Sequence, residues 1–294
     1  MNGNFFEKAG VAIRRIFASL FMETLSTMKN KFAARLLASI FTGLLALALT
    51  GCNTVPVTGR SQFNLMSTGQ EQQLGLTSFD KLKQETPISK DPAANALVQK
   101  VGHRIAAVAD KDMPGAQWEF VVFESKEANA FCLPGGKVGV YTGILPITKD
   151  EAGLATVIGH EVAHAVARHG GERMTEAMGL ELGSEILGVT LSNSDPRLQA
   201  AASAAYGLSS QVGVALPHSR AQESEADHIG LIYMARAGYD PRMAVAFWQR
   251  FADYNKQQGG NTPVFLRTHP SDAARIQQLQ VWMPDALAVY HPVP

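Results

Sequence analysis

Apolar residues recur three and four positions apart in several stretches of the chain, which predicts amphipathic helices. Residues 67–85 form one such stretch, and Asp91 followed by a proline predicts the start of a second. Residues 172–216 are rich in Ala, Gly, Leu and Ser and predict two further helices. This pair could form a lid over a neighbouring site or simply pack on other helices, and the pattern fits both.

The most strongly apolar helix is predicted after residue 148. Thr148 and Glu151 stand at capping-box spacing, and Gly170 and Gly171 end the pattern. Five apolar residues give this helix a buried face: Leu154, Val157, Ile158, Val162 and Val166.

Three stretches rich in β-branched and aromatic residues predict strands, at 118–124, 128–133 and 137–141, with a turn at 134–136. The second and third strands could form only a hairpin. Alternatively, the second could be an edge strand beside the active site that pairs with an extended substrate. Together the elements predict an α+β fold, mainly helical with a small antiparallel sheet.

The composition is that of a globular protein with a sizeable core. The chain has 294 residues, of which 46% are hydrophobic and 18% charged. Residues 1–51 hold six Lys and Arg against two Asp and Glu, which leaves 20 against 24 and a net charge of −4 for the remainder. Such a remainder does not indicate a nucleic-acid partner.

The first 51 residues have the character of a signal peptide, with Met28 as an alternative start. Basic residues precede an apolar run at 36–49, and Leu49-Thr50-Gly51-Cys52 resembles the lipobox of bacterial lipoproteins. We therefore expect Cys52 to carry lipid and residues 52–64 to form a tether. Asn53 after the cysteine resembles an outer-membrane address, which predicts the periplasmic side of that membrane; a retained signal anchor is the alternative.

His160, Glu161 and His164 form the pattern H-E-x-x-H within the helix predicted after residue 148. Residues four apart share one helix face, so the two histidines can offer imidazoles to one metal ion. Glu161 lies about 100° round the helix, where it can accept a proton from water. These are the groups that a zinc peptidase needs. His169 points roughly 140° away from His164, and we expect it to be structural or solvated.

A third ligand is available on another predicted helix, which begins at Ser219 with capping-box spacing to Gln222. Glu223 and Asp227 lie four apart on it, so one could bind the metal while the other orients a ligating histidine. A solvated acidic face that includes Glu225 is the alternative interpretation.

The combined motifs resemble the HtpX and CAAX-prenyl-protease family of gluzincin metallopeptidases. The residues that carry the resemblance are His160-Glu161-Val162-Ala163-His164, Ser219-Arg220, Glu223-Ser224-Glu225-Ala226-Asp227, Asn129-Ala130-Phe131, Tyr141-Thr142-Gly143 and Thr268-His269-Pro270. The likeness covers approximately residues 65–280, which we expect to lie in a metallopeptidase domain at 65–294. The lipobox-like segment makes the chain similar to periplasmic lipoprotein members, which include proteases of outer-membrane protein quality control.

The resemblance implies a zincin-like fold around the H-E-x-x-H helix and one zinc ion per chain. It implies His160, His164 and Glu223 as zinc ligands, with Glu161 as the general base. Asp227 matches the carboxylate that orients a ligand.

Two further residues come from the resemblance. His269 matches a histidine that in periplasmic relatives can lie over the metal and regulate access; capping of a helix start is the alternative. Arg220 could contact the carboxylates or the substrate.

The predicted function is zinc-dependent endopeptidase activity on misfolded or unassembled cell-envelope proteins, with the membrane reached through the lipid anchor. Two alternatives stay open at this point. One is a chaperone-like lipoprotein that binds envelope proteins with conditional or no proteolysis, and the other is a hydrolase of a non-peptide bond.

Overall fold

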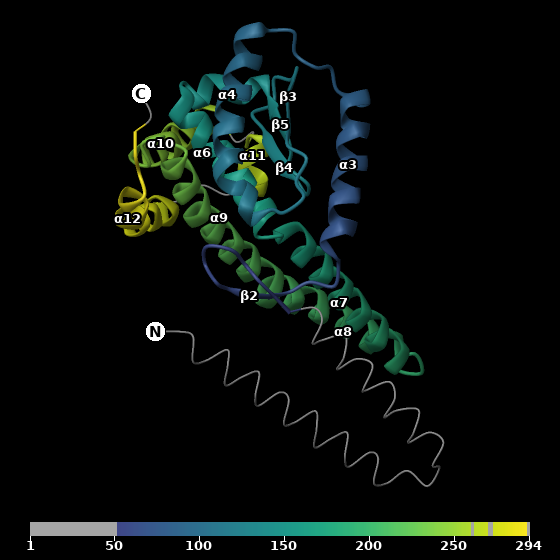
Figure 1. Cartoon of the computed structure of the whole chain (residues 1–294). Coiled ribbons are helices and arrows are strands. Elements are labelled where there is room, and N and C mark those ends of the chain that lie inside the picture. Colours follow the sequence, from purple (N-terminus) through teal and green to yellow (C-terminus); the bar gives the residue numbers. More distant parts are fainter. Residues whose placement is uncertain (1–51, 260–261, 270–272, 293–294) are drawn as a thin grey trace. The chain divides into compact units, whose positions relative to one another are not determined.

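The computed structural model describes residues 52–259, 262–269 and 273–292 (Figure 1). Residues 53–294 form one compact unit. The predicted signal segment at 1–51 lies outside the described residues. Cys52 begins strand β1, and its lipidation stays a prediction.

Helices make up most of the described chain. They are α3 (Thr68–Glu85), α4 (Pro92–Ala109), α5 (Leu145–Thr148), α6 (Glu151–Val166), α7 (His169–Thr190), α8 (Pro196–Ser210), α9 (Leu216–Arg236), α10 (Arg242–Gln257), α11 (Val264–Thr268) and α12 (Ala273–Ala288). Among the described residues, none of these helices is both long and apolar enough to cross a membrane.

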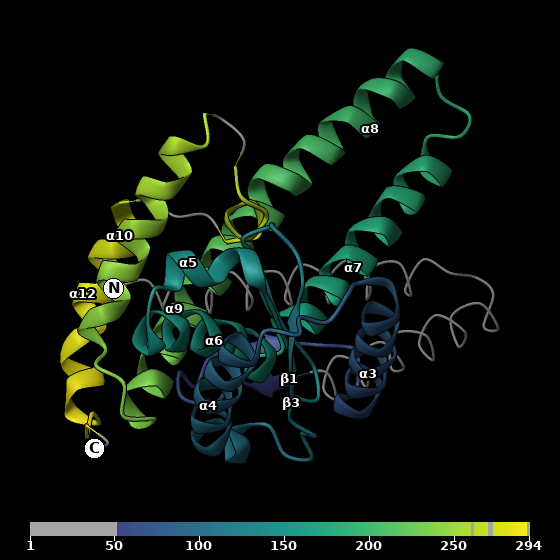
Figure 2. The same cartoon turned by 90° about the horizontal axis from the view of Figure 1, so that it is seen from above.

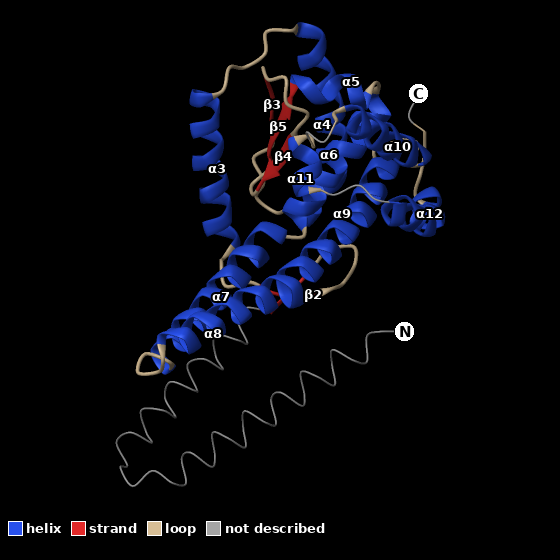
Figure 3. Cartoon of the chain, turned by 180° about the vertical axis from the view of Figure 1, so that it is seen from behind, coloured by secondary structure: helices blue, strands red, loops and turns tan. Residues whose placement is uncertain are grey.

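Two small sheets complete the fold. The first pairs β1 (Cys52–Thr54) with β2 (Ser61–Phe63), and the second has the order β3-β5-β4, formed by Glu119–Phe123, Lys137–Tyr141 and Ala130–Leu133. Helices α4 and α6 lie on one side of the larger sheet and α3 lies on the other (Figure 3). The predicted α+β class is confirmed.

The larger sheet is mixed rather than wholly antiparallel. β4 and β5 form the predicted antiparallel hairpin, with Phe131 opposite Gly139. β5 also inserts between β4 and β3, which it meets in parallel. As a result β4 becomes an edge strand, and its outer edge pairs with no strand among the described residues.

The early helices α3 and α4 both begin at a side-chain cap, of which Asp91 was predicted. Ser67 and Gln70 form a reciprocal capping box at the start of α3. Asp91 accepts hydrogen bonds from the amides of Ala93 and Ala94 at the start of α4.

The predicted start of α6 is wrong by two residues. Thr148 ends α5, and the chain then turns through Lys149, whose φ is 69°. Asp150 is the N-cap of α6, because its carboxylate accepts a hydrogen bond from the amide of Gly153 at 2.8 Å. Thr148 and Asp150 are both competent caps, and only the turn between them decided which acts.

The predicted end of α6 at Gly170 and Gly171 is also wrong. The helix ends at Val166, and Arg168 takes the left-handed conformation with φ 54°. Arg168 can hold this conformation because its guanidinium is fixed on Glu71, with Nε 2.8 Å from Oε2. Gly170 and Gly171 lie inside the first turn of α7.

The chain does not restart a helix at Ser219. A π-helical segment, Gln211–Ala215, joins α8 directly to α9, so Ser219 lies inside α9 and caps nothing. Helices α7 and α8 run side by side as a hairpin that extends beyond the other helices (Figure 2). Neither helix is predominantly buried, so the hairpin adds little to the core.

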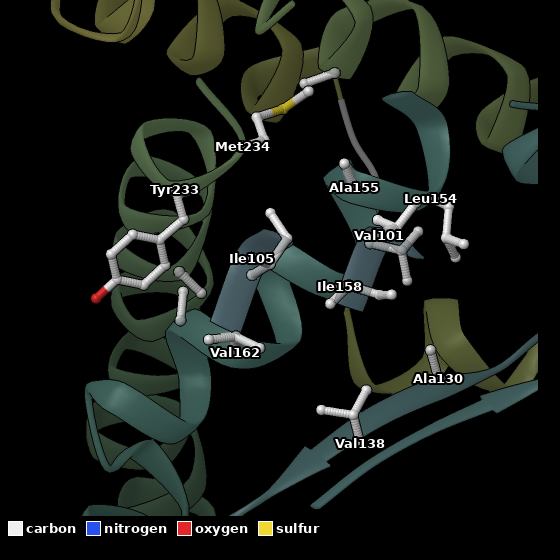
Figure 4. Close-up of a cluster of buried hydrophobic side chains, with 14 of the residues drawn as sticks. Val101, Ile105, Ala130, Val138, Leu154, Ala155, Ile158, Val162, Tyr233 and Met234 are labelled. Carbon is white, nitrogen blue, oxygen red and sulfur yellow. The ribbon is translucent and has the colours of Figure 1, made fainter. Parts of the chain in front are cut away.

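The core lies between α6 and the elements around it. Ile158 and Val162 of α6 are fully buried against Val101 and Ile105 of α4 and Tyr233 of α9 (Figure 4). Burying each such side chain stabilises the fold by about 1.5–3 kcal/mol. The same helix that presents the H-E-x-x-H residues is therefore the centre of the hydrophobic core.

Helices α6 and α9 cross at two glycines. A Cβ on Gly159 would lie 3.0 Å from the carbonyl oxygen of Gly230, and a Cβ on Gly230 would lie 2.9 Å from the amide nitrogen of His160. Both obstacles are backbone atoms, which cannot move aside as a flexible side chain can. The absence of side chains at this crossing brings the two backbones together.

We expect Gly230→Ala to lower the free energy of unfolding by about 1–3 kcal/mol, because the added methyl group overpacks the crossing. Urea unfolding would measure the change. Gly179→Ala is the matched control: that glycine lies in α7 with open space at its Cβ, and alanine there should raise stability by about 0.5–1 kcal/mol. Unchanged stability of Gly230→Ala would contradict the proposed backbone constraint.

Candidate metal centre

Four buried side chains meet at the crossing of α6 and α9. His160 and His164 come from α6, Glu223 comes from α9, and His269 follows α11. One donor atom from each lies within 4.8 Å of the others. Spacing predicted the two histidines as ligands, and the family resemblance added Glu223 and placed His269 over the metal; the fold brings all four together.

The donor atoms are spaced as a small metal cage requires. His160 Nε2 lies 3.1 Å from His164 Nε2 and 3.2 Å from His269 Nδ1. The carboxylate oxygens of Glu223 lie 3.3 Å from His160 Nε2, 3.2 Å from His164 Nε2 and 3.0 Å from His269 Nδ1. Ligands about 2.0–2.2 Å from a tetrahedral zinc ion would be about 3.3–3.6 Å apart, so these nitrogen and oxygen donors need to spread by only a few tenths of an ångström to hold zinc.

Glu223 is ionised in this environment. Burial alone would raise the pKa of its carboxyl group, but hydrogen bonds with three histidines hold that pKa well below its usual range. An anionic carboxylate beside imidazole nitrogens is a donor set that suits a divalent cation.

Asp227 lies one helical turn beyond Glu223, behind His160. His160 Nδ1 is 3.0 Å from Asp227 Oδ1, so it can donate a hydrogen bond to that carboxylate while Nε2 faces the other donors. Arg275 of α12 also donates to Asp227 Oδ1, over 2.6 Å, and its guanidinium lies 3.4 Å from the centroid of the Trp248 ring. Sequence reasoning missed Arg275, because no spacing pattern links it to the motif.

Glu161 faces the cluster without joining it. Its Oε1 is buried and has no hydrogen-bond partner among the described residues; His269 Nε2 lies 3.4 Å away without hydrogen-bonding geometry. Burial raises the pKa of Glu161 to about 7. A carboxylate with a free acceptor and a pKa near neutrality is suited to accept a proton from water.

Arg220 is exposed on α9 and makes no hydrogen bond or ion pair with the carboxylates of the cluster in the described part of the chain. Its position in the sequence motif could not show that its side chain leaves the helix on the solvent side. The alternative, a contact with the substrate, stays a prediction.

A cleft of about 340 Å³ opens beside the cluster. One wall is the edge strand β4, and Glu161, His164 and His269 lie along the cleft. Cys132 of β4 also lines it, and burial raises the pKa of its thiol, which therefore stays protonated and is no nucleophile.

Comparisons with known proteins agree with this site. The model of peptidase family M48 matches residues 92–283. Mitochondrial metalloendopeptidase OMA1 of Schizosaccharomyces pombe is 35% identical over 242 residues, which cover 79% of this chain and 66% of that protein. The protein of the same name from Saccharomyces cerevisiae is 32% identical over 280 residues, 90% of this chain and 79% of its own length.

The chain is also similar, at lower identity, to a bacterial enzyme. The Beta-barrel assembly-enhancing protease of Escherichia coli is 26% identical over 253 residues, which span 85% of this chain and about half (51%) of that protein. Fold, donor set and relatives together define a zinc metalloendopeptidase. The chain belongs to peptidase family M48.

The comparisons correct the predicted location and support the predicted family only at a coarser level. Location on the periplasmic side of the outer membrane is wrong, because the relatives at 32–39% identity are mitochondrial proteins. An apolar segment behind basic residues does not by itself distinguish one membrane system from another. The narrower assignment to the HtpX or periplasmic lipoprotein type gives way to membership of family M48.

We expect Asp227→Asn to weaken zinc binding about 10- to 100-fold, because His160 would lose the carboxylate that orients its ring. Competition with a chromophoric chelator would measure the zinc Kd. Asp240→Asn is the control, since Asp240 is paired only locally with Arg242. Equal zinc affinity of parent and Asp227→Asn would show that Asp227 does not orient the ligand.

Proposed function

We propose that this endopeptidase cleaves internal peptide bonds of misfolded or unassembled proteins at the His160–His164–Glu223 centre. The observation that carries the proposal is the buried donor cage directly beside an open edge strand. Folded proteins rarely offer an extended segment with free backbone groups, whereas unfolded chains offer many. The site therefore favours unfolded substrates.

The substrate backbone is proposed to bind along β4. A segment laid against the outer edge of that strand would gain main-chain hydrogen bonds, as in other cases of strand addition. The cleft lined by β4 and Glu161 then places one peptide bond at the cluster. Main-chain pairing is tolerant of sequence, which suits a protease with many substrates.

Three residues would hold zinc and one would move the proton. When bound, zinc polarises the substrate carbonyl and lowers the pKa of water. Glu161 accepts the proton of the attacking water on its carboxylate and can deliver it to the leaving amine. Asp227 keeps His160 in the tautomer that presents Nε2 to the cage.

His269 is proposed to regulate access to this centre. With His269 in place all four donors come from the protein, whereas a catalytic zinc site keeps one position open. The described arrangement is thus the closed form, and cleavage requires His269 to leave. Because His269 must leave first, we expect cleavage to depend on a signal or a substrate that displaces it.

We expect Glu161→Gln to retain one zinc per chain and to lower the rate of casein cleavage about 10²- to 10⁴-fold, because the proton acceptor is lost. Glu223→Ala should lose zinc as well as cleavage. Metal analysis and a fluorescent casein assay would measure both. Glu181→Gln on the exposed face of α7 is the control. Full cleavage by Glu161→Gln would rule out this mechanism.

We expect His269→Ala to increase casein cleavage per bound zinc, since it opens the fourth position of the cage. The assay would compare initial rates after zinc content is matched, with His103→Ala at an exposed site as the control. A slower rate with zinc still bound would assign His269 to substrate binding instead.

A further inference from the structure

The second nitrogen of His164 is not solvated. His164 Nδ1 lies 2.8 Å from Nδ1 of His169, which is completely buried at the start of α7. His169 Nε2 in turn lies 3.0 Å from Glu225 Oε2. Two imidazoles and a carboxylate thus form one line that begins at the metal cage and ends on α9.

Donor and acceptor roles along this line follow from the role proposed for His164. If Nε2 of His164 faces a metal ion, that ring must carry its proton on Nδ1. Nδ1 of His169 must then be the acceptor, which leaves His169 Nε2–H to donate to Glu225. Each contact has one donor and one acceptor, and each ring is neutral.

Glu225 is itself held from the N-terminal side of the domain. Thr58 donates to Glu225 Oε1, and Arg60 Nε lies 2.8 Å from Glu225 Oε2. The other two guanidinium nitrogens of Arg60 form a bidentate pair with Glu172, at 2.7 and 2.9 Å. The segment at 52–64, predicted as a tether, therefore contacts Glu225, the carboxylate at the far end of the line from the metal cage.

The carboxylates in this hydrogen-bonded line are buried, unlike those of a surface ion pair. Glu225 is 8% exposed and Glu172 is 4% exposed. Glu225 forms an ion pair with Arg60 over 2.8 Å and also accepts hydrogen bonds from Thr58 and His169, so three donors surround this carboxylate. The Glu225 carboxylate favours the tautomer of His169 that carries its proton on Nε2, the nitrogen that faces Glu225.

We propose that His169 and Glu225 are positioning residues that fix the tautomer and ring orientation of the metal ligand His164, with Arg60 anchoring Glu225. The inference rests on the proposed role of His164 as a zinc ligand. His164 is thus supported by the carboxylate of Glu225, as His160 is supported by that of Asp227. The difference is that the imidazole of His169 lies between His164 and its carboxylate. Carboxylates behind ligating histidines commonly change metal affinity 10- to 100-fold when they are replaced.

The test is zinc affinity of the full chain, measured by chelator competition for Glu225→Gln, His169→Phe and His169→Asn. Glu225→Gln and His169→Phe should each raise the zinc Kd about 10- to 100-fold. Asparagine places an acceptor oxygen where His169 has Nδ1, so His169→Asn should bind zinc more tightly than His169→Phe. The visible absorption of Co²⁺-loaded Glu225→Gln should shift from that of the parent, since His164 changes as a ligand.

Glu71→Gln is the matched control. Glu71 is also a buried glutamate paired with an arginine, Arg168, but it contacts no metal-ligand candidate. It should lose thermal stability while its zinc Kd stays that of the parent. Should His169→Phe fail to fold, Glu225→Gln decides the question, because it keeps the size of the side chain and one acceptor oxygen.

Parent affinity and an unchanged Co²⁺ spectrum in Glu225→Gln would overturn the inference and leave the line a structural network only. Equal Kd values for His169→Asn and His169→Phe would overturn the role given to the Nδ1 acceptor. Failure of the parent chain to bind zinc would instead refute the proposed function, so the two failures are distinguishable.

Discussion

The close crossing of α6 and α9 is the constraint on which the site depends. His160 and His164 are fixed to one helix and Glu223 to the other, so the distance between the backbones sets the size of the cage. Gly159 and Gly230 allow that approach, because each would otherwise place a methyl group on the partner backbone. Donors 3.0–3.3 Å apart follow from this contact together with the one-turn spacing of the histidines.

The fold buries several ionisable side chains around this crossing, which is costly unless each is paired. Two series of hydrogen-bonded side chains provide that pairing. Behind His160, Asp227 is held by Arg275 over Trp248; behind His164, Glu225 is reached through His169. Each series ends at an arginine outside α6 and α9: Arg275 behind His160 and Arg60 behind His164. The metal centre is therefore tied to the N-terminal segment and to the C-terminal helix α12 as well as to α6 and α9.

The donor cage is buried, whereas β4, the proposed substrate-binding edge, is partly exposed. The four donor residues of the cage are 2–8% exposed. His269 follows the short helix α11, and β4 leaves its outer edge unpaired among the described residues. If His269 leaves the cage as proposed, it opens the fourth position that a catalytic zinc site needs, and the activity of this endopeptidase would then be conditional.

The sequence by itself determined the local features: the caps of α3 and α4, the three strands of the larger sheet, the mainly helical class, and the one-face geometry of the H-E-x-x-H residues. Each depends on neighbours within a few positions, where periodicity and capping chemistry act. Tertiary structure decided the rest. It selected Asp150 over Thr148, continued α8 into α9, placed β5 between β4 and β3, and brought His269, Arg275 and the His169–Glu225 pair to the metal centre. The contacts of His269 with Glu223, of Glu225 with His169 and of Arg275 with His160 join residues 46 to 115 positions apart. No local pattern records which distant side chains a packed core will bring together.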